Sequence, residues 1–501
     1  MKKILCLLAM VMVVPYAHAQ EWVDGMKDHR VNFYEVQKSF NEYWKDREVE
    51  KGKGWKQFKR WENFMEPRVY PTGERPEPSL LFSAMQAASA QMSASQNLGE
   101  WQPVGPFQGN PMGGIGRINC IAFDPQHPDT VYVGAPAGGF WTSYNGGQTW
   151  TTTTDQLTNI GVSSIAVDPS NPQVIYIGTG DRDGGDTYSY GIMKSTDGGK
   201  TWNPTGFNQS ISSNTRIGQV WVDPSNSQVV IAATWWGIYR SANAGQTWQL
   251  EKSGTFHSVV SNPLNPDVLY AATIGANNAK IYKSTDNGLS WNQLTSGLPT
   301  SGVRRVEIGL TPVDTSYIYL LYGASNNGFY GMYRSVNGGQ SFSLRANSPN
   351  LMGWAVSGND SGGQAWYDLC IAVDPQNRDV IYTGGVNIWR STNGGTSWSL
   401  EAHWYGGGGA PYVHADHHYM AWQPKTDQLW IGNDGGITSK ARNQSVYTDH
   451  NDGLNITQYY KIGISETNSS KIIAGAQDNG THLNNLNWNR VRGGDGMDCE
   501  I

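Results

Sequence analysis

The sequence predicts an all-β fold, a β-propeller of four-stranded blades with a small helical region before it. Three observations predict this class. An eight-residue pattern recurs six times, a strand–turn–strand motif precedes most of its copies, and 60 Gly and 21 Trp stand beside only 16% charged residues in 501. Soluble domains carry about 25% charged residues. Many tight turns between aromatic-rich strands explain this composition.

The eight-residue pattern begins at Ser and ends at Trp or Phe. Its third residue, Asp or Asn, can bond the backbone of its own turn, and the Gly residues can take positive φ. The closing aromatic residue is large enough to wedge between neighbouring sheets. We interpret the copies as Asp-box turns with a structural role rather than a ligand-binding one. They span residues 143–150, 195–202, 241–248, 284–291, 335–342 and 391–398.

An Asp-Pro turn between two apolar stretches precedes most boxes, as at Asp124, Asp168 and Asp374. One unit therefore reads as four strands in a meander: strand, Asp-Pro turn, strand, variable loop, strand, Asp-box, short strand. The closing aromatic residues recur at intervals of about 43 to 56 residues, near the ~40–50 of a propeller blade. Two further units without a box begin near Tyr419 and Tyr459.

These repeats divide the chain into four parts. Residues 1–19 predict a signal peptide, with a basic start, an apolar run over 4–14 and a small-x-small site at 17–19. Residues 20–100 predict helices and a linker. Residues 101–490 predict about seven or eight blades. Residues 491–501 predict the start of a further blade and of a second propeller, so we expect the chain to be the front part of a longer protein.

A secreted or cell-surface location follows from the predicted signal peptide. No later segment is apolar enough to span a membrane. The net charge of −6 gives no attraction to nucleic acid. Three cysteines remain after residue 19, and we interpret Cys120, Cys370 and Cys499 as small core residues.

Blade topology predicts where a ligand could bind. In a four-stranded meander the first and third turns lie on one face, here the bottom face with the Asp-Pro turns and Asp-boxes. The second turns and the blade connections then share the opposite face, the top face. Carboxylates, histidines and aromatic residues gather in these top-face segments. A concave surface with converging polar groups is the default place for a ligand.

The candidate catalytic residues on the top face are Asp181, Asp416, Asp434 and Asp478. The candidate ligand-binding residues are Trp235, Trp236, Trp366, Tyr367, His414, His417 and Arg117. Carboxylates beside aromatic rings suit sugars, which stack on rings and bond through hydroxyl groups. We expect no cofactor.

Each candidate also has a structural interpretation. Asp434 and Asp478 stand in Gly-rich turns and can be turn-formers, and Trp235 and Trp236 can be inter-blade core. The segment 414–418 can be a hydrogen-bonded plug of the channel mouth. His414, Asp416 and His417 could bind a metal, but no third histidine follows at a diagnostic spacing.

The boxes, together with the sequence Gly-Arg-Ile at 116–118, Ile-Ala-Phe-Asp-Pro at 121–125 and Val-Tyr-Val-Gly at 131–134, resemble sortilin-type and xyloglucanase-type propellers. The resemblance covers residues from about 100 to 501. Residues 52–73 resemble the N-terminal region of large surface proteins of Bacteroidetes-type bacteria. That likeness implies the type IX export machinery as a transient partner and cell-surface attachment through a C-terminal region outside these residues.

The xyloglucanase resemblance implies hydrolysis by two Asp carboxylates, one of them in a Thr-Asp-Ile-Gly-Gly segment of the first blade. Residues 135–139 occupy that segment here, with Pro136 in place of the Asp. Hydrolysis would therefore need another pair, such as Asp181 with Asp434 or Asp478. Arg117, Arg216 and Arg305 resemble the arginine cluster that grips a carboxylate in sialidases, but no nucleophilic Tyr-Glu pair is identifiable.

From these patterns we expect a propeller that binds a glycan or a peptide through its top face, rather than an enzyme. One alternative is a glycoside hydrolase that uses the top-face carboxylates. The other is a sortilin-like receptor that holds a peptide inside a wide apolar channel. A carboxylate pair in an open cleft, with the pKa of one acid raised, would favour the hydrolase.

Overall fold

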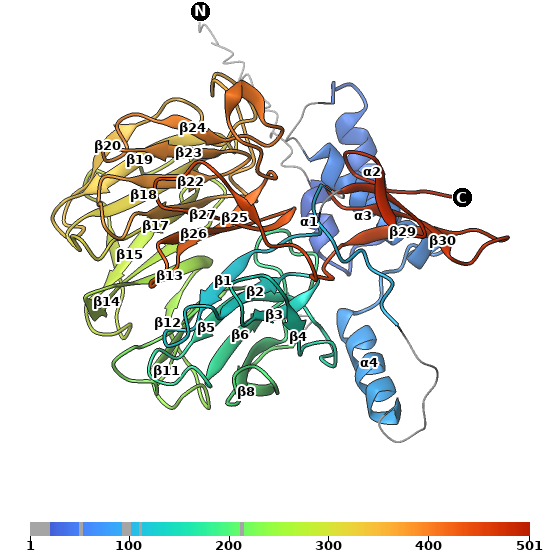
Figure 1. Ribbon diagram of the computed structural model, residues 1–501, viewed down its shortest axis with the longest axis horizontal. Helices are drawn as coiled ribbons and strands as arrows, with labels where there is room; N and C mark the ends of the chain where they lie inside the picture. The colour runs from blue at the N-terminus through green and yellow to red at the C-terminus, as the bar shows by residue number, and fades with distance from the viewer. Residues whose placement is uncertain (1–20, 50–53, 93–101, 110–112, 211–214) are drawn as a thin grey trace, which may run out of the picture. The chain divides into compact units, whose positions relative to one another are not determined.

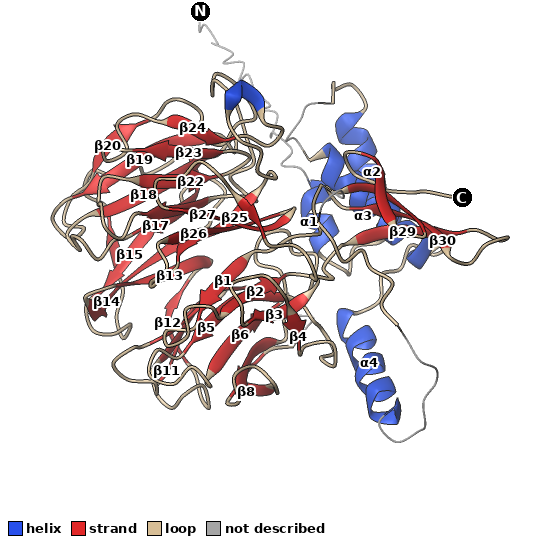
Figure 2. Ribbon diagram, in the orientation of Figure 1, coloured by secondary structure: helices blue, strands red, loops and turns tan. Residues whose placement is uncertain are grey.

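The computed structural model describes residues 21–49, 54–92, 102–109, 113–210 and 215–501, so the predicted signal peptide lies outside the described residues. The chain divides into two compact units, the first reaching Glu77 and the second beginning at Pro78. Figure 2 separates helices from strands. Among the described residues, no helix has both the length and the apolar character to cross a bilayer.

The first unit is helical and is held together by aromatic rings. It contains α1 (Glu21–Lys27), α2 (Phe33–Trp44) and α3 (Trp55–Val69), and α4 (Pro78–Met92) opens the second unit. Asn32 caps α2 by accepting a hydrogen bond from the Tyr34 N–H. Phe40 stacks on Phe58 with ring centroids 3.7 Å apart, and Trp22 meets Phe40 edge-on at 5.1 Å. Offset stacked and edge-on pairs are the favoured aromatic arrangements.

The second unit contains eight four-stranded antiparallel sheets among its described residues, each a meander in chain order. This confirms the predicted all-β fold class. The first four sheets (blades 1 to 4) are β1 (Cys120–Phe123), β2 (Val131–Ala135), β3 (Gly139–Ser143), β4 (Thr151–Thr152); β5 (Val162–Val167), β6 (Ile175–Thr179), β7 (Gly191–Ser195), β8 (Asn203–Asn208); β9 (Ile217–Val222), β10 (Val230–Thr234), β11 (Gly237–Ser241), β12 (Gln249–Ser253); and β13 (Phe256–Asn262), β14 (Asn265–Thr273), β15 (Ile281–Ser284), β16 (Asn292–Leu294).

The remaining sheets follow the same plan. Blades 5 to 7 and the eighth sheet are β17 (Val303–Gly309), β18 (Ile318–Ala324), β19 (Phe329–Ser335), β20 (Ser343–Ala346); β21 (Cys370–Val373), β22 (Ile381–Gly384), β23 (Ile388–Ser391), β24 (Ser399–Ala402); β25 (His417–Trp422), β26 (Gln428–Asn433), β27 (Gly436–Ala441), β28 (Thr448–Asp449); and β29 (Tyr459–Ile464), β30 (Lys471–Ala476), β31 (Gly480–Asn485), β32 (Trp488–Arg492).

Seven of the sheets close a ring. The first strands of neighbouring blades contact one another in the order β1, β5, β9, β13, β17, β21, β25, and β25 returns to β1. At this closure Ile121 of blade 1 shares a core cluster with Trp430 and Ile437 of blade 7. The backbone N–H of Ile118 also donates to the Asn433 carbonyl at 3.0 Å. The predicted seven or eight blades are therefore a closed ring of seven followed by one further sheet.

The eighth sheet follows the ring closure. Its first strand, β29, leaves Ile462 and Ile464 60% and 55% exposed. The Asn479 amide on its β30–β31 turn donates to the Asp434 carbonyl of blade 7 at 3.0 Å. After β32 the chain returns along β30 without forming a strand of its own, apart from a single bridge between Gly480 and Asp495. The one strand expected after residue 490 is thus absent from the described residues 493–501.

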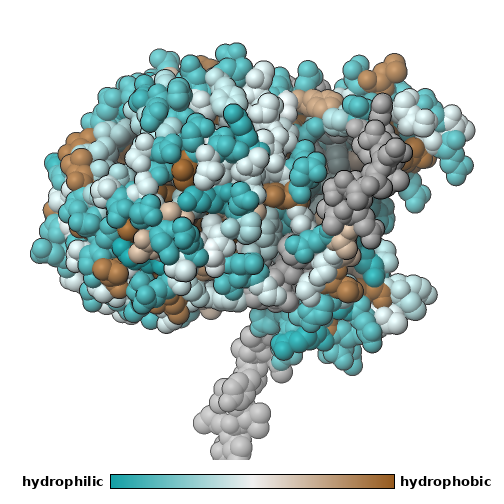
Figure 3. Space-filling view, turned by 90° about the horizontal axis from the view of Figure 1, so that it is seen from below, coloured by the Kyte–Doolittle hydropathy of each residue, from teal (hydrophilic) through white to brown (hydrophobic). Residues whose placement is uncertain are grey.

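The second strands of the blades are buried on both faces because each sheet packs between two others. All five residues of β2, β6 and β10 are buried. Exposed positions lie on the outer strands and turns, and the face in Figure 3 is mostly hydrophilic with scattered hydrophobic side chains. Single exposed apolar side chains are normal on folded proteins.

The repeated eight-residue turn is held by its own Ser and Asp. In blade 2 the Ser195 hydroxyl accepts from the Gly199 N–H at 2.8 Å and donates to the Asp197 carboxylate at 2.7 Å. That carboxylate in turn accepts from the Thr201 N–H at 2.9 Å. Gly199 has φ 86°, which favours glycine. These bonds agree with the structural role expected for the turn.

We expect Ser195→Ala to lower the free energy of unfolding of the propeller by about 1–3 kcal/mol. The Ser195 side chain is fully buried, so its loss leaves the Gly199 N–H without an acceptor. The change is measured by calorimetry, with faster hydrogen exchange at the Gly199 amide as the local signature. Ser343→Ala, at an exposed position of β20, is the control. Equal exchange at Gly199 in both variants would contradict this role.

Candidate functional site

The centre of the ring holds a buried network of charged side chains. Its hub is Asp183, which follows β6 in blade 2. One oxygen accepts from His257 Nε2 at 3.1 Å and from Arg305 at 3.2 Å, in blades 4 and 5. The other lies 3.1 Å from His418 Nδ1 in blade 7. A carboxylate of blade 2 that reaches blades 4, 5 and 7 must lie close to the ring axis.

Asp183 is ionised in this setting. Burial opposes ionisation, but the charges of Arg182 and Arg305 and the hydrogen bonds from His257 and His418 outweigh it, so the pKa of Asp183 lies well below its usual range. Arg305 also pairs with Glu307 at 3.0 Å. The network therefore offers each buried charge an opposite charge, as buried ions require.

His418 joins this network to the top face. Its Nδ1 faces Asp183, and its Nε2 lies 2.8 Å from the Asp434 carboxylate. Burial lowers the pKa of His418, but the hydrogen bonds and charges of Asp183 and Asp434 prevail and raise it to about 9. At neutral pH the ring is an imidazolium that donates from both nitrogens.

Asp434 lies in the β26–β27 turn and is 2% exposed. Besides His418, it accepts from the Tyr367 hydroxyl at 2.7 Å. Arg117 donates to the same hydroxyl at 2.8 Å. Each oxygen of Asp434 therefore has a donor, and both donors come from buried side chains.

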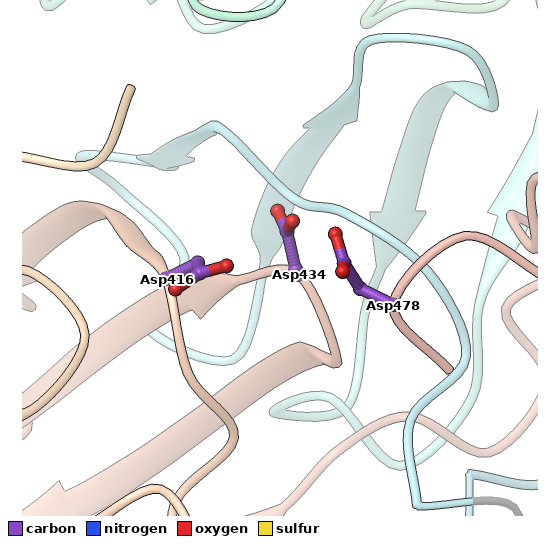
Figure 4. A group of neighbouring side chains, drawn as sticks. All are labelled: Asp416, Asp434 and Asp478. Carbon is purple, nitrogen blue, oxygen red and sulfur yellow. The ribbon is translucent and has the colours of Figure 1, made fainter. Parts of the chain in front are cut away.

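Three of the predicted carboxylates meet at this point. Asp416 precedes β25, Asp434 follows β26, and Asp478 lies in the β30–β31 turn of the eighth sheet. One oxygen of each lies within 4.8 Å of the others. Figure 4 shows Asp434 between Asp416 and Asp478. We call these three residues the carboxylate cluster.

Within the carboxylate cluster, Asp416 has a pKa that is raised far above its usual value. Burial raises the pKa of Asp416 to about 7, with further contributions from the charges of Asp434 and Asp478, while Asp368 and His418 act in the opposite direction. The Gln364 amide donates to Asp416 at 2.8 Å. Asp416 is half-buried and has φ 65°, a left-handed conformation that Asp tolerates better than most residues.

Asp368 lies behind Asp416 and is fully buried. Neither of its oxygens has a hydrogen-bond partner among the described residues. Burial raises the pKa of Asp368 well above its usual range, and so does the facing Asp416 carboxyl. Burial and the facing carboxyl thus favour the protonated form of Asp368.

Asp181, the fourth candidate carboxylate, is not part of the cluster. It forms an ion pair with Arg117 at 2.8 Å, and both side chains are almost completely buried. Arg305 is likewise paired with Asp183, and Arg216 stacks on the Trp235 ring at 3.9 Å. Each of the three arginines that resemble a sialidase cluster thus has a partner within the protein. They do not form a site that is free to bind the carboxylate of a ligand.

The predicted ligand-binding residues divide between the cluster and its surroundings. Tyr367 and Arg117 belong to the buried support of Asp434. Trp366 is half-buried, with its ring 5.2 Å from that of Tyr367. Trp236 is 39% exposed. Trp236 and Trp366, like the half-buried Trp235, therefore keep some exposed ring surface.

His414, Asp416 and His417, which could bind a metal, do not form a group of neighbouring ligand atoms among the described residues. His417 is buried in the inter-blade packing. Burial lowers the pKa of His417 to about 3, helped by His414 and His418. His414 Nδ1 lies 3.2 Å from the Ala415 carbonyl. His417 is the first residue of β25, whereas His414 and Asp416 lie in the loop before it.

Sequence reasoning left out several residues of the site. Asp183, Asp368 and His418 stand in the top-face segments but had no feature to separate them from their neighbours. His257 and Glu307 lie on the first strands of their blades. Charged residues within those otherwise apolar strands were the available signal, since a first strand faces the ring centre.

Comparison of the sequence with known proteins finds similarity to xyloglucanases. No family model matches the chain. A xyloglucanase of Acetivibrio thermocellus, Xgh74A, is 26% identical over 339 residues, which cover 58% of this chain and 39% of the relative. A xyloglucanase of Hypocrea jecorina is 28% identical over 181 residues, covering 32% and 20%. The chain thus spans less than half the length of these curated relatives.

Solved structures give the same picture for the fold. The GH74 xyloglucanase of Xanthomonas campestris superposes with a TM-score of 0.56 at 17% identity, over 73% of this chain and 58% of that one. The GH74 enzyme of Niastella koreensis gives 0.51 at 19% identity, over 74% and 65%. At this identity the likeness shows a shared propeller fold and leaves the activity to the site.

Proposed function

We propose that the chain is a glycoside hydrolase that acts on a polysaccharide of the xyloglucan kind, with the carboxylate cluster as its catalytic centre. The observation that carries the proposal is a carboxyl with its pKa near 7, Asp416, beside ionisable carboxylates within 4.8 Å. Glycoside hydrolysis needs one protonated and one ionised carboxyl flanking the scissile bond. The xyloglucanase relatives support this class of substrate.

The surroundings suggest a role for each member. Asp416 is the general acid, because it is half-buried and its pKa of about 7 leaves a large protonated fraction at neutral pH. Asp478, also half-buried, is the second carboxylate, acting on the sugar or on water. Asp434 has both oxygens occupied by His418 and Tyr367, so it is a positioning residue whose charge helps to keep Asp416 protonated.

The distance between the two catalytic carboxyl groups distinguishes the two mechanisms of glycoside hydrolysis. Inverting enzymes hold their two carboxyl groups ~6.5–9.5 Å apart to admit a water, whereas retaining enzymes hold them ~5–5.5 Å apart. In the cluster the nearest carboxyl oxygens lie within 4.8 Å of one another. The stereochemistry of the first product decides which of the two arrangements applies.

A second candidate function is glycan binding without hydrolysis. Pro136 occupies the position where the resemblance places a catalytic Asp, and Trp236 and Trp366 remain available for sugar rings. The peptide-receptor alternative has less support, since charged side chains occupy the ring centre where it expects an apolar channel. Secretion rests on the predicted signal peptide, whereas surface attachment and type IX export rest on the sequence resemblance, and all three remain proposals.

Reducing-end release from xyloglucan, mixed-linkage β-glucan and arabinoxylan tests the proposal. We expect the wild type to release sugar from at least one of them and Asp416→Asn or Asp478→Asn to lose about 10²–10⁴-fold in rate. Asp267→Asn, at an exposed position of β14, is the matched control. No release by the wild type, together with retention on one polysaccharide, would support the binding function instead.

A further inference from the structure

One position of the repeat carries a cation in five consecutive blades. It is the residue directly before the first Ser of the eight-residue turn, and its members are Lys194, Arg240, Lys283, Arg334 and Arg390 in blades 2 to 6. In blades 2 to 4 this cation bonds to the corresponding turn of the next blade. Lys194 donates to the Ala244 carbonyl at 3.1 Å, Arg240 to Asn287 at 2.9 Å and Lys283 to Gly338 at 2.7 Å.

Blades 5 and 6 depart from this pattern: Arg334 pairs with Asp379 at 3.6 Å, whereas Arg390 has no such partner in the part of the chain that the structure describes. The next blade, blade 7, has no eight-residue turn, and residues 442–447 replace it. No hydrogen bond or ion pair of the Arg390 guanidinium occurs among the described residues, and its Nε is buried without an acceptor. The Tyr382 ring lies 5.7 Å from the guanidinium carbon. An unmatched buried donor is costly unless a ligand or water completes it.

A pocket occupies the space that the missing turn leaves. Its volume is ≈ 480 Å³, and its wall includes Arg390, Lys440, Glu401 and Leu400. Lys440 is 2% exposed and forms an ion pair with Glu401. These two charges cancel, so the guanidinium of Arg390 gives the pocket one net positive charge.

The rest of the wall suits a hydroxylated ring. Asn443, Gln444 and Ser445 contribute amide and hydroxyl groups. On another side Gly408 and Gly409 line the pocket, and a side chain at Gly409 would meet nothing within 4 Å. Both have positive φ, which favours glycine, but only the space beside Gly409 is open to a ligand, because a side chain at Gly408 would meet Val356. The half-buried Leu400 offers an apolar surface.

From this geometry we infer that the pocket between blades 6 and 7 binds the carboxylate of an acidic sugar, a uronic acid unit of a polysaccharide. The planar guanidinium of Arg390 takes the carboxylate as a two-pronged hydrogen-bonded pair, which suits Arg better than Lys. One net positive charge matches one carboxylate. The site is separate from the carboxylate cluster and does not depend on hydrolysis there.

Titration calorimetry of the full chain with trigalacturonate tests the inference. We expect binding to the wild type that weakens with salt, and a loss of about tenfold or more in affinity for Arg390→Gln. Arg390→Lys keeps the charge without the fork and should give an intermediate loss. Arg240→Gln, at the same repeat position in blade 3, should bind as the wild type does.

Three results would overturn the inference. They are no binding of trigalacturonate to the wild type, equal binding by Arg390→Gln, and tighter binding of a sulfated oligosaccharide of the same length. Near-UV circular dichroism of each variant checks that the propeller is intact. Hydrolysis of a neutral polysaccharide by Arg390→Gln should match the wild type, which separates this site from the proposed catalytic one.

Discussion

Asp183→Asn is expected to destabilise the propeller by about 3–5 kcal/mol, the largest stability effect we foresee for a single substitution. The amide keeps the shape of the side chain but removes the charge that faces Arg182, Arg305 and His418. Those cations would then be buried without full compensation. Because Asp183 joins blades 2, 4, 5 and 7, the loss affects closure of the whole ring.

Calorimetry of the full-length variant measures this effect, with Asp267→Asn as the exposed control. The transition assigned to the propeller should fall in temperature, while the helical unit, residues up to Glu77, should be unaffected. A variant that fails to accumulate in soluble form while the control does so points in the same direction. A destabilisation below about 1 kcal/mol would show that the network does not hold the ring together.

Hydrolysis is expected to decline above about pH 7, because a general acid must carry its proton. The pKa of Asp416 is raised by burial to about 7, so the acid is protonated below that pH and ionised above it. The groups that face it are Asp368, Asp434, Asp478 and His418. We expect kcat/KM to fall about tenfold per pH unit on the alkaline side.

A substitution of the neighbouring Asp434 tests whether Asp416 causes the decline of kcat/KM above pH 7. Asp434→Asn removes one negative charge beside Asp416, so the pKa of Asp416 should fall and the alkaline limb should move to lower pH. The rate at the optimum can also fall, but a purely structural defect would not move the limb. A limb unchanged in Asp434→Asn would contradict the role of Asp416 as the acid.

The fold could be predicted from the sequence because local signals repeat. Ser, Asp or Asn, Gly and a closing aromatic residue act within one turn, so their pattern survives in the chain and predicts the blades. Ring closure is different, because the contact of β1 with β25 joins segments almost 300 residues apart. No local pattern distinguishes seven closed blades with one extra sheet from eight.

The site was predictable in part. Topology placed Asp416, Asp434 and Asp478 on one face, and the structure brings them together. Their roles depend on neighbours distant in sequence, such as Tyr367 and His418 around Asp434. Asp181 looked equivalent in the sequence, but a buried arginine from another blade neutralises it.

The most direct test of the catalytic proposal compares binding and hydrolysis in Asp416→Asn on the polysaccharide that the wild type cleaves. The account predicts that the variant stays bound to the polysaccharide with nearly unchanged affinity while its release of reducing ends falls by at least about 10²-fold. Release at the wild-type rate would contradict a catalytic role for Asp416 and remove the carboxylate cluster as the centre of the reaction.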